Sequence, residues 1–248
     1  MKKILIAFAI ILVQNTQAQS VIIDKVKIEF DRQINVWASY PPGEFADRMK
    51  KNTPQYTSNL FTFESDGKKS LYSPIPAKET ATGNGFFMSG VGSANDNIVY
   101  SNFENGTSIS LKNIFEKTYL IEDSLRNAKW KITNDFREIA GFNCRRATTT
   151  IMDSVFVVAF YSDEIMIPGG PESFNGLPGM IMGLVINRLH TTWYATKVSV
   201  TNVNQLTIVP PVKAKAVKTT MKKLTDLLRS TFSNWGSNTD KSIWAVSI

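Results

Sequence analysis

The chain has 248 residues, a hydrophobic fraction of 43%, a formal net charge of +7 and one cysteine. A single cysteine excludes an intramolecular disulfide, so the fold must be stabilised by its hydrophobic core alone. The charge is moderate, +5 without Lys2 and Lys3, and does not indicate a nucleic-acid-binding protein.

The N-terminal segment predicts a cleaved signal peptide over residues 1–18. Two lysines are followed by an apolar run, Ile4–Val13, and by small residues before the expected cleavage point. This run is shorter than the roughly twenty residues that cross a bilayer, and no later stretch reaches that length. We therefore expect residues 19–248 to form a single exported domain, in the periplasm, at the outer membrane or secreted, with no transmembrane segment. A short N-terminal membrane anchor is the alternative.

Strand-like segments dominate the rest of the chain. Residues 25–37 alternate, with Val26, Ile28 and Phe30 on one face and charged residues on the other, which is typical of a half-buried antiparallel strand. Similar runs are NLFTF (59–63), NIVYSNF (97–103), SISL (108–111), TYLIE (118–122), KWKIT (129–133, with Trp130 and Ile132 inward), VFVVAFY (155–161), MIMGLVI (180–186) and TWYATKVSV (192–200). A sheet with this many strands must curl or split in two.

Three segments depart from this pattern. Residues 44–53 predict a short helix or an irregular loop, and the glycine-rich residues 76–96 predict a loop. Apolar residues recur every three to four positions from Val212 to Asn234, which predicts an amphipathic helix. Its basic face is either the solvated side of a helix packed on a sheet or a surface for anionic lipid. Together, the strands and this helix predict a mainly β fold, an antiparallel sheet partly covered by a helix.

The segment IPGGPESFNGLPGMIMGL, residues 167–184, concentrates glycine and proline between apolar residues. Leu177–Met180 has the chemistry of a type II turn, with proline at the second position and glycine at the third, and Ile167–Gly170 offers the same turn. Phe174 lies between the turns and is predicted to plug the loop into the core. The residues that we assign to this motif are Gly169, Gly170, Pro171, Phe174, Gly176, Leu177, Pro178 and Gly179. The segment lacks the pattern of a phosphate-binding loop or a nucleophile elbow.

This segment resembles the motif of the GLPGLI family, exported proteins of Bacteroidetes that are named for it. The similarity continues through REIAGFNCRRAT (137–148), VVAFYSDEI (157–165) and HTTWYATKV (190–198), while Met180 and Met182 replace aliphatic residues. The resemblance implies a curved antiparallel sheet or half-barrel similar to periplasmic lipoprotein carriers, with a C-terminal amphipathic helix. It also implies a place beside outer-membrane proteins of the TonB-dependent receptor type, and no established catalytic residue.

Two chemistries compete with a binding or structural role. Cys144 and His190 form a thiol hydrolase pair if the fold brings them together, although a lone cysteine is more often a buried hydrophobe. A Cu(I) site is the other alternative, because Met166, Met180, Met182 and His190 surround the double turn and Cys144 has a suitable thiol. No spacing of ligands indicates zinc. Asp163 and Glu164 are neighbours on a strand and point to opposite faces, so they do not form a carboxylate pair.

The favoured expectation is an exported, envelope-associated binding or structural protein. It holds an apolar ligand such as an acyl chain, or it docks onto an outer-membrane protein. We expect no cofactor, no metal and no nucleic acid, and we leave enzymatic activity open.

Overall fold

The computed structural model describes residue 23 and the ranges 25–76, 94–200, 208–232 and 238–248. The predicted signal peptide and most of the predicted 76–96 loop lie outside these residues. The strands are β1 (Val26–Asn35), β2 (Tyr56–Ser65), β3 (Lys69–Pro74), β4 (Ile98–Asn102), β5 (Thr107–Ile114), β6 (Lys117–Ser124), β7 (Lys131–Ile139), β8 (Phe142–Ile151), β9 (Val155–Ser162), β10 (Met180–Ile186), β11 (Thr191–Val200) and β12 (Val217–Thr219). The α-helices are α1 (Glu44–Asn52), α2 (Met221–Thr231) and α3 (Asn238–Ser247), with 3-10 turns at Trp37–Ser39 and Asn187–Leu189.

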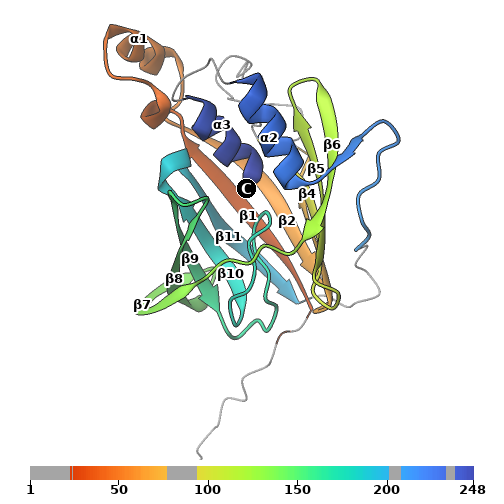
Figure 1. Cartoon of the computed structure of the whole chain (residues 1–248). Coiled ribbons are helices and arrows are strands. Elements are labelled where there is room, and N and C mark those ends of the chain that lie inside the picture. The colour runs from red at the N-terminus through yellow and green to blue at the C-terminus, as the bar shows by residue number, and fades with distance from the viewer. Residues whose placement is uncertain (1–22, 24, 77–93, 201–207, 233–237) are drawn as a thin grey trace, which may run out of the picture.

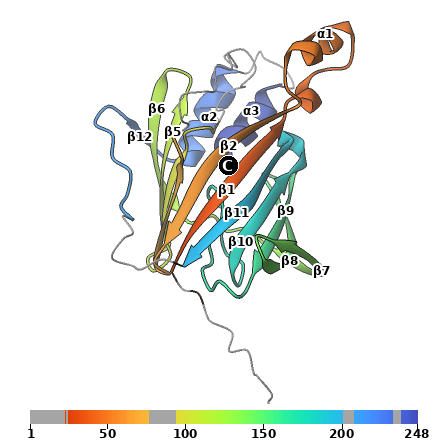
Figure 2. The ribbon, with the colours of Figure 1, turned by 180° about the vertical axis from the view of Figure 1, so that it is seen from behind.

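The strands form one open 12-stranded sheet in the order β12-β6-β5-β4-β3-β2-β1-β11-β10-β9-β8-β7. Neighbouring strands run antiparallel except β12, which pairs in parallel with β6. The sheet curves around α2 and α3, which cover its concave face (Figure 1). The view from behind shows β1 between β2 and β11, with the helices on the far side (Figure 2). The predicted mainly β fold with a C-terminal helix is confirmed.

The inward row of β1 changes from apolar to charged along the strand. Val26, Ile28 and Phe30 are completely buried, as their alternation predicts, and they contribute to the main core. Arg32 follows at the next inward position and is only 5% exposed. The strand therefore places the Arg32 guanidinium in the concave interior.

The C-terminal helix is shorter than the predicted span from Val212 to Asn234. Residues 217–219 instead form the edge strand β12, and α2 begins at Met221 after Thr220, whose Oγ1 accepts a hydrogen bond from the Lys223 N–H. Two prolines upstream and the β-branched Val217 and Thr219 explain the difference, because they disfavour helix and favour strand. The 44–53 segment adopts the helical one of its two predicted alternatives.

Two hydrophobic clusters stabilise the layers. The main core lies on the sheet, and a second cluster joins α2 and α3 to β5 and β6 through Leu224, Leu228, Ile243, Ile121 and other apolar side chains. The apolar face of α2 is thus used inside the protein, as expected of a helix packed on a sheet. No helix in the described ranges has the length and apolar character required to cross a bilayer.

The predicted inward orientation of Ile132 is wrong. Ile132 is 39% exposed, because β7 is the last strand of the sheet and most of its side chains face solvent. Trp130 does pack against the core, from the segment just before β7.

Candidate functional site

The glycine- and proline-rich loop between β9 and β10 enters the interior of the protein. Phe174 is 1% exposed, as the predicted plug requires, and its ring lies 6.4 Å from that of Trp130. Trp130 Nε1 also donates to the Asn175 carbonyl at 2.9 Å. The Gly176 N–H donates to the Pro168 carbonyl at 3.0 Å, which closes the loop on itself. The loop is therefore a fixed part of the core.

Gly179 is required by close packing and not by the predicted type II turn. Its φ of 159° is positive, in a region that residues with a side chain rarely adopt, whereas a type II turn needs a φ of about +80° at this position. A Cβ atom on Gly179 would lie 2.2 Å from the Ser162 carbonyl oxygen. Gly179 therefore lets the loop pass directly against the end of β9 where it enters β10.

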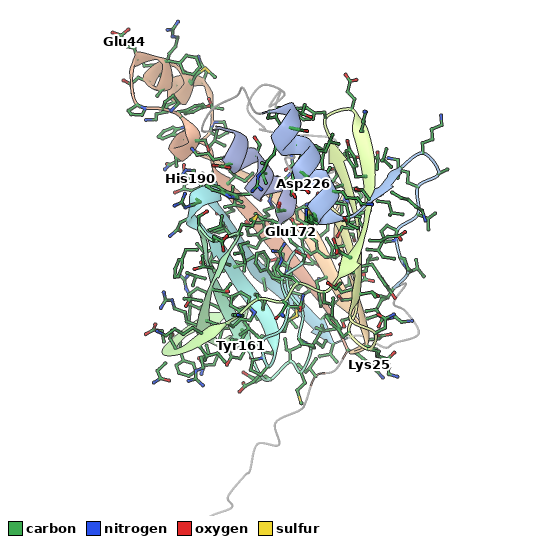
Figure 3. The ribbon with its side chains drawn as sticks, in the orientation of Figure 1. Lys25, Glu44, Tyr161, Glu172, His190 and Asp226 are labelled. Carbon is green, nitrogen blue, oxygen red and sulfur yellow. The ribbon has the colours of Figure 1, made fainter. Side chains whose placement is uncertain are left out.

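The same loop buries a carboxylate. Glu172 is 2% exposed and has a left-handed φ of 55°, an uncommon conformation for a residue with a side chain. Its Oε2 atom accepts a hydrogen bond from Asn97 Nδ2 at 2.9 Å. Figure 3 shows Glu172 in the middle of the molecule, beneath the helices.

Three cationic side chains lie around Glu172. Arg32 donates through Nη1 to Asn95 Oδ1 at 2.8 Å. Lys112, from the inward row of β5, donates to the Val246 carbonyl of α3 at 2.9 Å. Arg126, just after β6, is held by several acceptors: Nε and Nη2 donate to Ser173 Oγ at 2.9 and 2.8 Å, and Nη2 also donates to the Ser247 carbonyl.

Burial and the single carboxylate control the protonation of this cluster. Burial lowers the pKa of Lys112 to about 8 and that of Arg126 to about 10, and the charge of Glu172 opposes both shifts. Burial also lowers the pKa of Arg32, again against Glu172. With three cations around one carboxylate, the interior of the sheet is electropositive.

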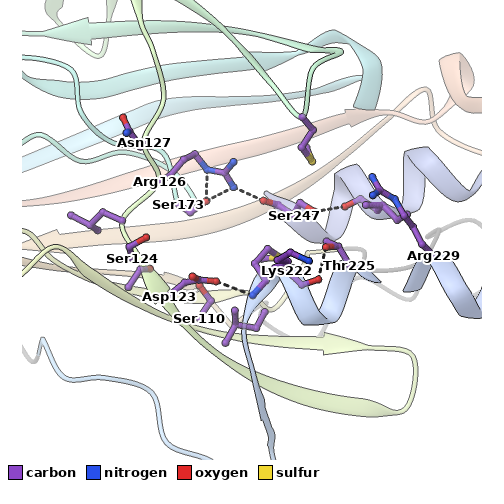
Figure 4. Close-up of a pocket in the computed structure, with 16 residues that line it drawn as sticks. Ser110, Asp123, Ser124, Arg126, Asn127, Ser173, Lys222, Thr225, Arg229 and Ser247 are labelled. Atoms are coloured by element: carbon purple, nitrogen blue, oxygen red, sulfur yellow. Dashed lines mark hydrogen bonds between the residues drawn. The ribbon is translucent and has the colours of Figure 1, made fainter. Parts of the chain in front are cut away.

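A cavity of about 390 Å³ opens beside this cluster, between β5, β6, the Arg126 segment and the two C-terminal helices (Figure 4). Its size falls within the range of small-molecule sites. The lining mixes polar and apolar side chains. The polar ones are Ser108, Ser110, Asp123, Ser124, Arg126, Asn127, Ser173, Lys222, Thr225, Arg229 and Ser247, and the apolar ones are Ile121, Leu125, Met152, Met221 and Ile243.

The charged groups of this lining differ in their availability. Asp123 accepts a hydrogen bond from the Met221 N–H at the start of α2, and Lys222 pairs with Asp226 at 2.8 Å. Arg229 has no hydrogen bond or ion pair within the described part of the chain. Arg229 is therefore the cation of the cavity that is free to meet an anionic ligand.

The structure does not bring Cys144 and His190 together. Arg145, next to Cys144, pairs with Tyr161 on β9, and Ser162 pairs with Met180 at the start of β10. His190 follows the other end of β10, about 20 Å away at the usual rise of a strand. Figure 3 shows Tyr161 and His190 at opposite ends of the sheet.

The proposed copper ligands are separated in the same way. Met180 and Met182 are buried in the core near Cys144, whereas Met166 is 59% exposed and His190 lies at the far end of β10. Across the ranges that the structure describes, no group of three His, Cys, Asp or Glu side chains is arranged to hold a metal ion. Burial lowers the pKa of His190, and the charge of Lys241 lowers it further.

Cys144 is expected to be inert in the folded protein. It is completely buried, and this burial raises its pKa to about 12, so the reactive thiolate is scarce at neutral pH. A chromogenic disulfide reagent at pH 7.5 should release less than about a tenth of an equivalent of chromophore before unfolding and a full equivalent in guanidinium. Rapid reaction of the native protein would contradict this description of the core.

Sequence reasoning overlooked the inward cations, although a signal was present for Arg32. Arg32 has the same parity as Phe30 in β1, so alternation places it inside. Lys112 has the same parity as Ser108 and Ser110 in β5, whereas the apolar Ile109 and Leu111 lie on the other face, so alternation does not predict its burial. No local pattern indicated that Glu172 would face them, because it lies on a loop distant in sequence.

The fold and the site define a mainly β protein whose open, curved sheet holds a charged interior and a polar cavity beneath two helices. A family described as "Protein of unknown function (Porph_ging)", associated with Bacteroidetes, matches residues 149–183, which include the whole β9–β10 loop. No curated protein matches the sequence.

The chain is similar to several solved structures at low sequence identity. PNGF-II in space group C2 is 13% identical with a TM-score of 0.50, and PNGF-II in P21 is 12% identical with a TM-score of 0.47. Both matches cover 82% of this chain but only 32% and 33% of the PNGF-II chains, so this chain spans about a third of their length. An uncharacterized conserved protein from Thermus thermophilus is 6% identical with a TM-score of 0.40, over 79% of this chain and 91% of its own. The first of these similarities shows a common fold and nothing more.

Proposed function

We propose that this chain is an exported binding protein of the cell envelope and a member of the GLPGLI family. Its cavity beneath α2 and α3 takes a small amphiphilic ligand that carries an acidic group. The signal-peptide pattern of residues 1–18 supports export, and the GLPG segment supports the family.

One observation carries the binding proposal: the mixed lining of the cavity. Apolar side chains such as Ile121 and Ile243 suit a hydrocarbon part, while the serines and Arg126 suit a polar group. The positive sign of the local charge favours an acid over a neutral or basic headgroup. This refines the apolar ligand expected from the sequence, because a plain hydrocarbon would leave the polar side chains of the lining without partners.

Decanoate is expected to bind the purified protein more tightly than decanol, which has the same chain without the charge. Replacing Arg229 with alanine should weaken decanoate binding by about threefold to fivefold and leave decanol binding unchanged, as expected for one partly solvated charge pair. Isothermal titration calorimetry at pH 7.5 measures both ligands on both proteins.

Lys223→Ala is the matched control, because Lys223 is an exposed cation on the same helix that does not line the cavity. Its decanoate affinity should equal that of the unmodified protein. The proposal fails if neither ligand binds, if decanol binds as tightly as decanoate, or if the two variants lose affinity equally.

A further inference from the structure

The concave side of β1, β3 and β11 contains a second polar cluster. Four buried atoms there have no hydrogen-bond partner of normal geometry among the described residues: Arg32 Nε, Tyr72 Oη, Trp193 Nε1 and Glu172 Oε1. All four side chains are at least 95% buried. Three of the atoms carry a hydrogen to donate, and the carboxylate oxygen only accepts. Unpaired groups of this kind are rare in protein interiors because each forfeits its hydration.

These atoms belong to one neighbourhood. Arg32 and Trp193 are paired in register, and the guanidinium carbon lies 5.7 Å from the centroid of the Trp193 ring. Burial, and then the charge of Glu172, raise the pKa of Tyr72, while Arg32 and the Trp193 N–H act in the opposite direction. The phenol, the guanidinium, the indole and the carboxylate are therefore close enough to influence one another.

Arg32 and Glu172 nevertheless do not pair. Their charges interact, yet within the described ranges no basic nitrogen lies within 4.0 Å of the Glu172 carboxylate. A bridging group would satisfy these buried atoms and join the two opposite charges. That group must accept hydrogen bonds from the Arg32 side and donate one to Glu172.

We propose that this cluster is a buried site for a hydroxycarboxylate, a carboxylate with a hydroxyl group on the neighbouring carbon. The ligand carboxylate accepts from Arg32 Nε and Tyr72 Oη, and its hydroxyl group donates to Glu172 Oε1. An anion also offsets the excess of positive charge that Lys112 and Arg126 create around the single carboxylate. A plain carboxylate would leave Glu172 Oε1 without a hydrogen bond, and a neutral alcohol would leave the excess positive charge uncompensated.

This site is distinct from the cavity of the proposed function, since none of its four side chains lines that cavity. Glycolate is the smallest probe with the required groups. Acetate lacks the hydroxyl group, ethylene glycol lacks the charge, and chloride controls for ionic strength. Thermal unfolding of the full chain, with each probe titrated at constant ionic strength, reports binding to the folded state.

Glycolate is expected to raise the unfolding temperature saturably, with acetate requiring a roughly tenfold higher concentration and ethylene glycol having no saturable effect. Tyr72→Phe removes one donor and should raise the half-saturating glycolate concentration about tenfold. Glu172→Gln should abolish the preference for glycolate over acetate, because its amide no longer presents a charged acceptor to the hydroxyl group. Tyr161→Phe, the same substitution at a buried tyrosine of β9, should change neither value.

The proposal is overturned if glycolate, acetate and chloride act alike, or if Tyr72→Phe responds to glycolate as Tyr161→Phe does. Should Tyr72→Phe not fold, the glycolate-to-acetate preference of Glu172→Gln decides the question alone. If the protein binds decanoate but does not bind glycolate, the buried site is refuted and the cavity proposal is still supported. Glycolate binding without decanoate binding would do the reverse.

Discussion

Replacing Gly179 with alanine is expected to destabilise the protein by about 3 kcal/mol or more. The added Cβ would lie 2.2 Å from the Ser162 carbonyl oxygen and 2.9 Å from the Asp163 Cα, both backbone atoms of the segment where β9 ends. Backbone cannot rotate aside as a side chain can, so the start of β10 would have to move away from β9. Urea unfolding followed by circular dichroism measures the change in the free energy of unfolding.

Gly106→Ala is the control for this substitution. Gly106 has a left-handed φ of 71° in the hairpin between β4 and β5, and no atom lies within 4 Å of the added methyl group. Its cost should be only the conformational one, about 1 kcal/mol. Equal losses in the two variants would show that steric contact at Gly179 is not what the motif glycine provides.

Lys112→Met is expected to stabilise the protein by about 2 kcal/mol at pH 7. Methionine fills a similar volume without a buried ammonium, whose depressed pKa corresponds to a penalty of about 3 kcal/mol, and the Val246 carbonyl loses a hydrogen bond that contributes about 1 kcal/mol. Loss of the Lys112 charge also removes its electrostatic repulsion of Arg32 and Arg126.

The pH dependence of this effect has a definite sign. The pKa of Lys112 is lowered to about 8 in the folded protein, so between about pH 8 and 10.5 the unfolded chain binds a proton that the folded protein has released. The contribution of Lys112 therefore increases the free energy of unfolding of the unmodified protein as the pH rises through that window. The advantage of Lys112→Met should shrink above pH 8 and vanish near pH 10.

Urea unfolding of both proteins at pH 7, 8.5 and 10 measures the difference. Lys223→Met, at an exposed position of α2, should show no such pH-dependent gap from the unmodified protein. A constant difference between Lys112→Met and the unmodified protein across this range would mean that the Lys112 ammonium is hydrated and not buried.

These predictions connect the stability of the protein to its proposed binding roles. Lys112 and Arg126 are held by carbonyl groups of the last turn of α3, and that turn also forms part of the cavity lining through Ser247. A buried charge that costs stability is more readily understood where a ligand can compensate it. The electropositive interior is thus the feature that both binding experiments test.

Much of the architecture was predictable because it follows from local periodicity. The alternation of 25–37 defines β1, and the Asn105-Gly106 pair marks the hairpin between β4 and β5. The burial of Phe174 followed from an apolar residue between two predicted turns, although neither Gly169 nor Gly179 adopts the φ of a type II turn. The start of α2 was predicted less well, since the apolar spacing before Met221 also suits the short strand that pairs with β6.

The sequence by itself determined a β-rich chain, the parity that turns Arg32 inward, and the glycine- and proline-rich loop after β9. Only the tertiary structure decided that Glu172 faces those cations and that Cys144 and His190 lie far apart. The physical reason is the strand order: β1 pairs with β11 across more than 150 residues, and contacts of that range depend on how the whole sheet curves. Side-chain periodicity determines which face a residue occupies, whereas the curvature of the sheet determines which residues meet across its interior.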